Sequence, residues 1–172
     1  MSNFKYTRPD SFPPIVKNLV IINVLVFVAQ LLLDKQYALT DRLAMWPLMP
    51  DRLHQFLVQQ HVITDTEKFQ PYQIATHMFT HSPSSIFHIV FNMFTLWMFG
   101  RVLENVWGAK RFLLFYIICG LGAAALHLGI QYLRCQQLLD AIDANDIAGI
   151  QARIGAVAPA VGASGAIMAL FH

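Results

Sequence analysis

The chain has 172 residues, of which 56% are hydrophobic and 13% are charged. Soluble domains average about 45–50% apolar and about 25% charged residues, so this balance predicts an integral membrane protein. The formal net charge of +2 argues against a nucleic-acid-binding surface, and the two cysteines lack the spacing of a zinc site or a disulfide framework.

The N-terminal part predicts a polar tail followed by a first membrane span. Residues 1–14 are polar and rich in proline, and we interpret them as a cytoplasmic tail. The apolar run over about residues 15–33 is long enough to cross ~30 Å of hydrocarbon. It is also longer than the core of a cleavable signal peptide, so we expect a retained transmembrane helix.

A long, mixed connection follows over residues 34–83, and connections of this length tend to carry function. Between Pro50 and Gln60, leucine and phenylalanine recur at helical spacing with polar residues between them. This pattern predicts a short amphipathic helix that lies in the membrane interface. The sequence His-Ser-Pro-Ser-Ser, at 81–85, is typical of a loop that ends at a helix cap.

Two further spans are predicted at about residues 86–103 and 112–133, separated by Trp-Gly, a helix stop. Arg101 and Glu104 stand three residues apart at the end of the earlier span, so they can pair on one helix face and lock the helix end. The polar residues 134–153 carry apolar residues at helical intervals, which predicts a surface helix or two short helices.

The last apolar stretch, about residues 156–172, predicts the start of a fourth span and contains Ser164. Basic residues are concentrated in the N-terminal tail and in the turn between the second and third spans. By the positive-inside rule the N-terminus is then cytoplasmic and the long first loop lies outside. Both the serine and the polar start of the second span would therefore sit at shallow depth on the outer side.

Three polar residues in apolar surroundings are candidates for a site. Asn92 follows His88 by one helical turn, so both project from one face and could donate hydrogen bonds to one oxyanion. The pair could equally join two helices by hydrogen bonds. Ser164, flanked by Gly162 and Gly165, could be a nucleophile or a small packing residue.

Histidines elsewhere give weaker signals. His77 and His81 stand four residues apart and precede His88, but no carboxylate or cysteine is placed to complete a metal site. We interpret His81 as a structural residue of the loop before the second span. His127, alone on the third span, is interpreted as a hydrogen-bonded residue between helices.

Together these stretches resemble the rhomboid family of intramembrane serine proteases, most closely its bacterial members. The resemblance rests on His-Ile-Val-Phe-Asn at 88–92, Glu-Asn-Val-Trp-Gly at 104–108 with Arg111 behind it, and Gly-Ala-Ser-Gly at 162–165. Phe-Gln-Pro-Tyr-Gln at 69–73 also matches the family's approach to its second helix. The order of the motifs matches from about residue 12 to the end.

The resemblance implies an all-α, polytopic membrane bundle of six helices, of which residues 15–172 would be the N-terminal part with about four spans. It implies that Ser164 is the nucleophile and that His88, Asn92 and the Ser164 backbone amide stabilise the oxyanion. Structural residues near the site would be Gly162, Gly165, Glu104, Arg111 and His81. Substrates would be single-span membrane proteins within the lipid bilayer of a bacterial inner membrane, and no cofactor or metal is implied.

The chain departs from the family pattern in one respect, because the family's base is a histidine on the sixth helix. His172 follows Ser164 by eight residues, about 12 Å along a helix, which is beyond hydrogen-bond reach. We therefore expect a chain truncated after the fourth helix and inactive as it stands, since a serine without a base is a weak nucleophile. The alternative is a non-catalytic rhomboid-like membrane protein that binds transmembrane clients.

Overall fold

The computed structural model of the protein describes residues 10–162, and within them the only pairing of β type is one antiparallel bridge between Met45 and Ala160. All regular elements are helical, which confirms the predicted all-α class. In chain order they are α1 (Pro14–Tyr37), α2 (Leu39–Leu43), α3 (Asp51–Gln59), α4 (Gln73–Thr76), α5 (Ile86–Trp107), α6 (Ala109–Asp143), α7 (Ile147–Arg153) and the 3-10 helix η1 (Ile154–Val157).

Three described helices, α1, α5 and α6, are long and apolar enough to cross a membrane. They contain the three spans predicted at about 15–33, 86–103 and 112–133. The fourth predicted span, about 156–172, lies mostly outside the described residues. Its first residues, up to 157, belong to η1, and 158–162 are not helical.

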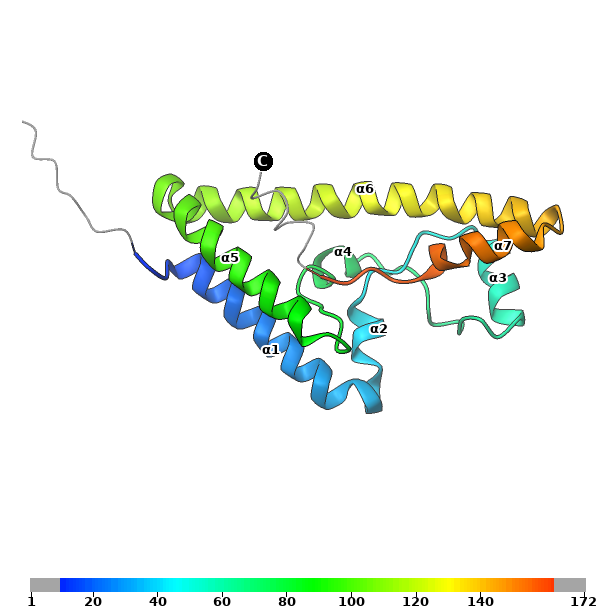
Figure 1. Ribbon diagram of the computed structural model, residues 1–172, viewed down its shortest axis with the longest axis horizontal. Coiled ribbons are helices and arrows are strands. Elements are labelled where there is room, and N and C mark those ends of the chain that lie inside the picture. Colours follow the sequence, from blue (N-terminus) through cyan, green and yellow to red (C-terminus); the bar gives the residue numbers. More distant parts are fainter. Residues whose placement is uncertain (1–9, 163–172) are drawn as a thin grey trace, which may run out of the picture.

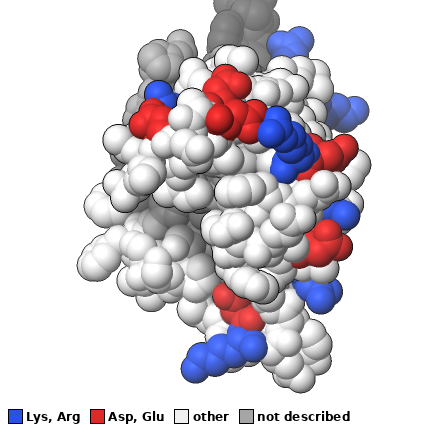
Figure 2. All heavy atoms as spheres, turned by 90° about the vertical axis from the view of Figure 1, so that its right-hand side faces the viewer, with Lys and Arg blue, Asp and Glu red and all other residues white. Residues whose placement is uncertain are grey.

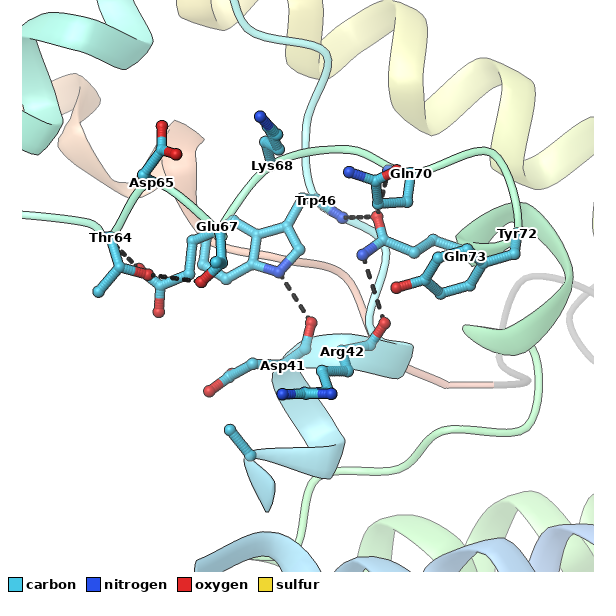
Figure 3. A pocket seen from close by; sticks show the side chains of 12 residues that line it. Asp41, Arg42, Trp46, Thr64, Asp65, Glu67, Lys68, Gln70, Tyr72 and Gln73 are labelled. Carbon is cyan, nitrogen blue, oxygen red and sulfur yellow. Dashed lines mark hydrogen bonds between the residues drawn. The ribbon is translucent and has the colours of Figure 1, made fainter. Parts of the chain in front are cut away.

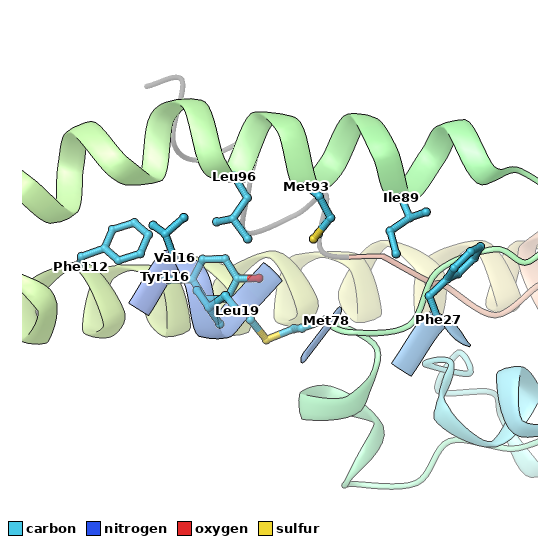
Figure 4. Packing of buried hydrophobic residues seen from close by; sticks show 9 residues of the cluster. All are labelled: Val16, Leu19, Phe27, Met78, Ile89, Met93, Leu96, Phe112 and Tyr116. Atoms are coloured by element: carbon cyan, nitrogen blue, oxygen red, sulfur yellow. The ribbon is translucent and has the colours of Figure 1, made fainter. Parts of the chain in front are cut away.

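Helices α1 and α5 lie side by side and antiparallel (Figure 1). Helix α6 begins where α1 starts and α5 ends, and it runs away from them at an angle, so that the three helices form a V. The core of the bundle lies where they meet. Its buried residues, shown in Figure 4, are Val16, Leu19, Phe27, Met78, Ile89, Met93, Leu96, Phe112 and Tyr116. Apolar side chains also cover much of the outer faces of α1 and α5, as expected for surfaces in contact with lipid.

A second body of structure, which we call the loop module, lies between the arms of the V and along the far end of α6 (Figure 1). It consists of α2, α3, α4, the last turns of α6, α7 and η1. Its own core is separate from that of the bundle and contains Trp46, Leu53, Leu57, Ile63, Cys135, Leu138 and Val157. The apolar face of α3 is therefore turned toward protein, not toward the membrane surface that its amphipathic pattern predicts.

Helix α6 has 35 residues, about 52 Å at 1.5 Å per residue, and so exceeds the ~30 Å of a hydrocarbon core. The polar residues from 134 to 143, expected as a separate surface helix, continue α6 instead. Arg52 of α3 forms a bidentate ion pair with Asp143 at the end of α6, with N–O distances of 2.8 and 2.7 Å. Figure 2 shows acidic and basic side chains interspersed on this face, with neither sign forming a continuous patch.

Candidate active site

The candidate site begins in the first two turns of α5. His88 is half-buried there, and its backbone amide donates to the carbonyl of Ser85 at 3.1 Å, which fastens the start of the helix. Asn92 lies one turn later and is 9% exposed. Its amide nitrogen Nδ2 is buried and has no hydrogen-bond partner among the described residues. Seven buried side-chain atoms of the described residues have no partner, and this donor is the one that lies a single turn from His88 on α5, where a ligand could supply the acceptor.

His81 lies beside His88, with ring centroids 5.5 Å apart and the planes inclined at 61°. It is fully buried, and the side chain of Gln30 on α1 forms hydrogen bonds with both its backbone carbonyl and its backbone amide. The side-chain nitrogen of Gln30 donates to the His81 carbonyl at 2.8 Å, and the His81 amide donates to the Gln30 oxygen at 3.1 Å. The loop before α5 is thereby fixed to the first span.

Burial, helped by the nearby His88, lowers the pKa of His81 to about 4, although the Phe79 carbonyl acts in the opposite direction. At neutral pH the ring is therefore uncharged. Its Nδ1 lies 3.3 Å from the Phe79 carbonyl, so this nitrogen carries the proton if the contact is a hydrogen bond. Its Nε2 is then a buried acceptor, and it has no partner among the described residues.

The segment that leads toward Ser164 is fastened to the loop module. Ala160 and Met45 exchange two backbone hydrogen bonds, each of 2.9 Å, in the isolated bridge. Gly162 has a positive φ of 116°, and its amide donates to the His77 carbonyl at 3.1 Å. Two predicted site residues, Ser164 and Gly165, lie outside the described residues, so their geometry stays a prediction.

Helix α6 supports this segment from the other side. The Gln131 side chain donates to the Ala158 carbonyl at 3.4 Å. Ala160 packs against the cluster that contains Leu128 and Ala124, about one and two turns before Gln131. The segment 158–162 therefore runs antiparallel to α6. Residues from α4, α6 and the first loop together hold the backbone just ahead of the serine.

His77 belongs to the same surroundings. Its ring nitrogen Nδ1 lies 2.9 Å from the Gln73 carbonyl, and its pKa is lowered by burial and, less, by the neighbouring His127. His127 on α6 therefore lies near His77. Its Nε2 is buried without a partner among the described residues, so the hydrogen bond expected for it is not seen there.

Glu104 and Arg111 lie far from these groups. Glu104 is twelve residues after Asn92 on the same helix, about 18 Å along its axis. Its two carboxylate oxygens accept hydrogen bonds from the backbone amides of Ile15 and Val16, at 3.0 and 2.8 Å. Arg111 is exposed in the first turn of α6. Both residues are thus placed where the bundle closes, at the end opposite to the site.

The expected pairing of Glu104 with Arg101 is not what the structure shows. The Arg101 guanidinium lies over the indole of Trp97, 4.4 Å from its centroid, while Glu104 is turned to α1. The first turn of α1 has backbone amides without partners inside the helix, and it carries the positive end of the helix dipole. The buried Glu104 carboxylate accepts hydrogen bonds from two of these amides and interacts favourably with the dipole. This interaction is worth more than an exposed ion pair within one helix.

Sequence reasoning missed several residues that hold the site together. Gln30 is the clearest example, because a fully buried glutamine inside an apolar span is costly and needs partners. That signal was available in the sequence. The bridge between Met45 and Ala160 was not, since residues 115 positions apart in an irregular segment leave no pattern.

No group of three or more His, Cys, Asp or Glu side chains among residues 10–162 is arranged to hold a metal ion.

A family model described as the Rhomboid domain matches residues 68–172, which is more than half of the chain. The matched part includes α5, α6 and every residue that the sequence predicts for the candidate site. A comparison with curated proteins finds no match.

Proposed function

The chain belongs to the rhomboid family, and on this premise we propose that it acts as an intramembrane serine endopeptidase. Family membership and three apolar helices make it an integral membrane protein related to the rhomboid proteases. The observation that carries the finer proposal is the start of α5, where Asn92 presents, beside His88, a buried donor that has no partner among the described residues. A site that must bind a developing oxyanion needs such donors to be free before substrate arrives.

In the proposed mechanism the Ser164 hydroxyl oxygen attacks the carbonyl carbon of a substrate peptide bond, while its proton passes to a base. The tetrahedral oxyanion is stabilised by donors from His88, from the Asn92 amide and from the Ser164 backbone N–H. Collapse of the intermediate transfers the proton to the leaving amine and leaves an acyl-enzyme on the serine. Water then hydrolyses the ester and restores the hydroxyl.

The position of Gly162 supports this assignment of the serine. Its hydrogen bond to His77 and the bridge at Ala160 hold the backbone two to four residues ahead of Ser164 against the first loop. His77 is in turn four residues before His81, which contacts His88. The approach to the serine and the start of α5 are thus connected through one short stretch of chain.

The base is proposed to be a histidine of a later helix, as the resemblance implies. His81 is unsuitable, because it is fully buried and its ring already contacts His88 and the Phe79 carbonyl. His88 itself is assigned to the oxyanion. On this proposal the chain of 172 residues shows negligible proteolysis by itself.

Substrates are proposed to be single-span membrane proteins that reach the site through the bilayer, in a bacterial inner membrane with the N-terminus cytoplasmic. The loop module would then lie on the outer side. Its position at the end of α1 and the start of α5 agrees with one common side for loop and site (Figure 1). Cysteine labelling with a membrane-impermeant reagent at Thr66 tests this orientation, since that residue is exposed in the loop module.

The deciding experiment is labelling with a serine-directed fluorophosphonate. It is applied to the 172-residue chain and to the product of the full reading frame, each beside Ser164→Ala. Labelling of the longer product alone, lost in Ser164→Ala, is the expected result. Labelling and substrate cleavage by the 172-residue chain would contradict the proposed base. Failure of every folded form to react would favour the client-binding alternative.

A further inference from the structure

The loop module contains a cavity of about 590 Å³ that is separate from the candidate active site. Figure 3 shows it from close by, with the lining residue Trp46 in the middle of the view. Asp41 and Arg42 of α2 line one side, and the loop segment with Glu67 and Lys68 lines the other. Its size is in the range of ordinary small-molecule sites, about 300–1,000 Å³.

The cavity adjoins the C-terminal end of α1, a helix long and apolar enough to cross a membrane. Its wall includes Ala38, the residue at which the first membrane-spanning helix ends. A spanning helix ends where hydrocarbon gives way to the headgroup region, so the adjoining α2 is held at that depth. Trp46 and Tyr72 line the cavity too, and these residue types are enriched at membrane interfaces. The indole N–H of Trp46 donates to the Asp41 carbonyl at 2.9 Å, which fixes the ring in the wall.

Charges of both signs line the cavity without neutralising one another. Within residues 10–162 the only ion pair joins Arg52 to Asp143, outside this cavity. The Glu67 carboxylate accepts from the backbone amide of Thr64 at 2.6 Å, and no carboxylate here contacts Arg42 or Lys68. The cavity therefore offers separate anionic and cationic groups to a ligand.

The anionic side has an excess of negative charge. Burial raises the pKa of the Asp41 carboxyl above its usual range, and the carboxylates of Glu67 and Asp34 raise it further. Arg42, although adjacent in sequence, does not cancel this effect. A cation placed between Asp41 and Glu67 would relieve the repulsion. The carboxylates do not converge with a third ligand into a metal site among the described residues, which favours an organic cation.

We propose that this cavity binds the headgroup of a zwitterionic aminophospholipid. The primary ammonium lies toward Asp41 and Glu67, where its three N–H donors meet carboxylate oxygens. The phosphate lies toward the Arg42 guanidinium, with Lys68 at the rim. The acyl chains leave the cavity toward the bilayer beside the end of α1.

Trp46 and Gln73 connect this site to the rest of the molecule. Gln73 is 2% exposed; its side chain donates to the Arg42 carbonyl at 3.4 Å and accepts from the Trp46 amide at 3.3 Å. A bound headgroup would therefore hold α2 and α4 together across the cavity. The inference concerns lipid binding, and it stands whether or not the chain cleaves peptide bonds.

The test measures bound lipid by native mass spectrometry, after the detergent-solubilised protein is equilibrated with equal amounts of phosphatidylethanolamine, phosphatidylcholine and phosphatidylglycerol. We expect phosphatidylethanolamine to be retained at least threefold over the other two. Asp41→Asn combined with Glu67→Gln should abolish this preference, because the ammonium loses both partners. Lys68→Gln, an exposed change that leaves folding intact, should weaken retention of both zwitterionic and anionic lipid.

Asp140→Asn is the matched control, since it removes an exposed carboxylate at the far end of α6, and it should retain lipid as the unaltered protein does. Equal retention of the three lipids by the unaltered protein would overturn the proposal, as would an unchanged preference in the Asp41/Glu67 variant. Soluble phosphoethanolamine should compete only weakly. Competition as strong as that of the lipid would reassign the site to a soluble aminophosphate.

Discussion

At its C-terminal end, helix α5 carries Glu104, whose two carboxylate oxygens both accept backbone hydrogen bonds from α1. At its N-terminal end, the same helix carries Asn92, whose buried amide nitrogen has no partner among the described residues. One helix thus combines a satisfied, closely packed end with an end that keeps a donor open. Gly100 strengthens the contrast, because its backbone lies against Val16 and Phe112 in the core.

The difference separates the end of α5 that contributes free energy of folding from the end to which we assign the proposed function. Buried polar groups with partners stabilise a structure, whereas buried groups without partners are costly and are retained where a ligand needs them. The closed end of α5 can therefore support an open end about 18 Å away along the same helix. Substitutions at the two ends should have opposite consequences for stability and activity.

The largest expected effect is that of Glu104→Ala at the closed end. It leaves the amides of Ile15 and Val16 without their partner at the start of α1, where the Glu104 side chain is 4% exposed. We expect the free energy of unfolding to fall by about 2–5 kcal/mol, as measured by denaturation in mixed detergent micelles. Glu104→Gln, which keeps one acceptor, should lose less. Equal losses in both variants would contradict the double hydrogen bond.

The next effect in size is a dependence of stability on pH at the open end. The pKa of His81 is lowered to about 4 in the folded protein, against 6.5 as its ordinary value. The stability that the neutral His81 ring contributes is therefore fully present above pH 6.5 and is lost as the pH falls from 6.5 through 4. The reason is that the unfolded chain takes up the proton at a higher pH than the folded protein does. The complete loss amounts to about 3 kcal/mol.

Unfolding in micelles at pH 7.5, 6 and 5 measures this loss. At each pH, the free energy of unfolding of His81→Gln is subtracted from that of the unaltered protein. This difference removes the contributions of other titrating groups. The two curves should diverge below pH 6.5, with the unaltered protein losing stability faster. Parallel curves would show that the His81 ring takes up its proton as readily in the folded state as in the unfolded one.

Gly100→Ala should cost about 1–3 kcal/mol, because the added methyl would meet the Val16 side chain at 2.8 Å and Phe112 at 3.2 Å. Val16 is fully buried and β-branched, so it cannot move aside easily. The matched control is Gly122→Ala on α6, where a new methyl meets nothing within 4 Å. That control should be neutral or slightly stabilising. Similar losses in both would refute the close packing at α5.

The smallest effect on stability is expected for Asn92→Ala, at less than about 1 kcal/mol, because the substitution removes a donor that has no partner among the described residues. In the proteolytically competent form the same change should reduce kcat about 10²–10³-fold, if Asn92 contacts the oxyanion. Unfolding and cleavage are measured on the same preparations. A large loss of stability would instead assign Asn92 to the structure.

Much of the fold and part of the site were predictable from the sequence. The three spans follow from continuous apolar runs, and the polar positions within α5 follow from their rarity in such runs. The placing of Ser164 stays a prediction, since that residue lies outside the described part. The order of the motifs was sufficient to predict the rhomboid family, which the family model confirms.

The sequence by itself determined which segments enter the membrane, because transfer to hydrocarbon depends on the composition of about 20 consecutive residues. Only the tertiary structure decided the partners: Glu104 with the start of α1, Gln30 with the backbone of His81, α3 with the end of α6, and Met45 with Ala160. The physical reason is that a buried polar group or apolar face binds whichever complementary group the chain brings within reach. That choice depends on distances in space between residues far apart along the chain.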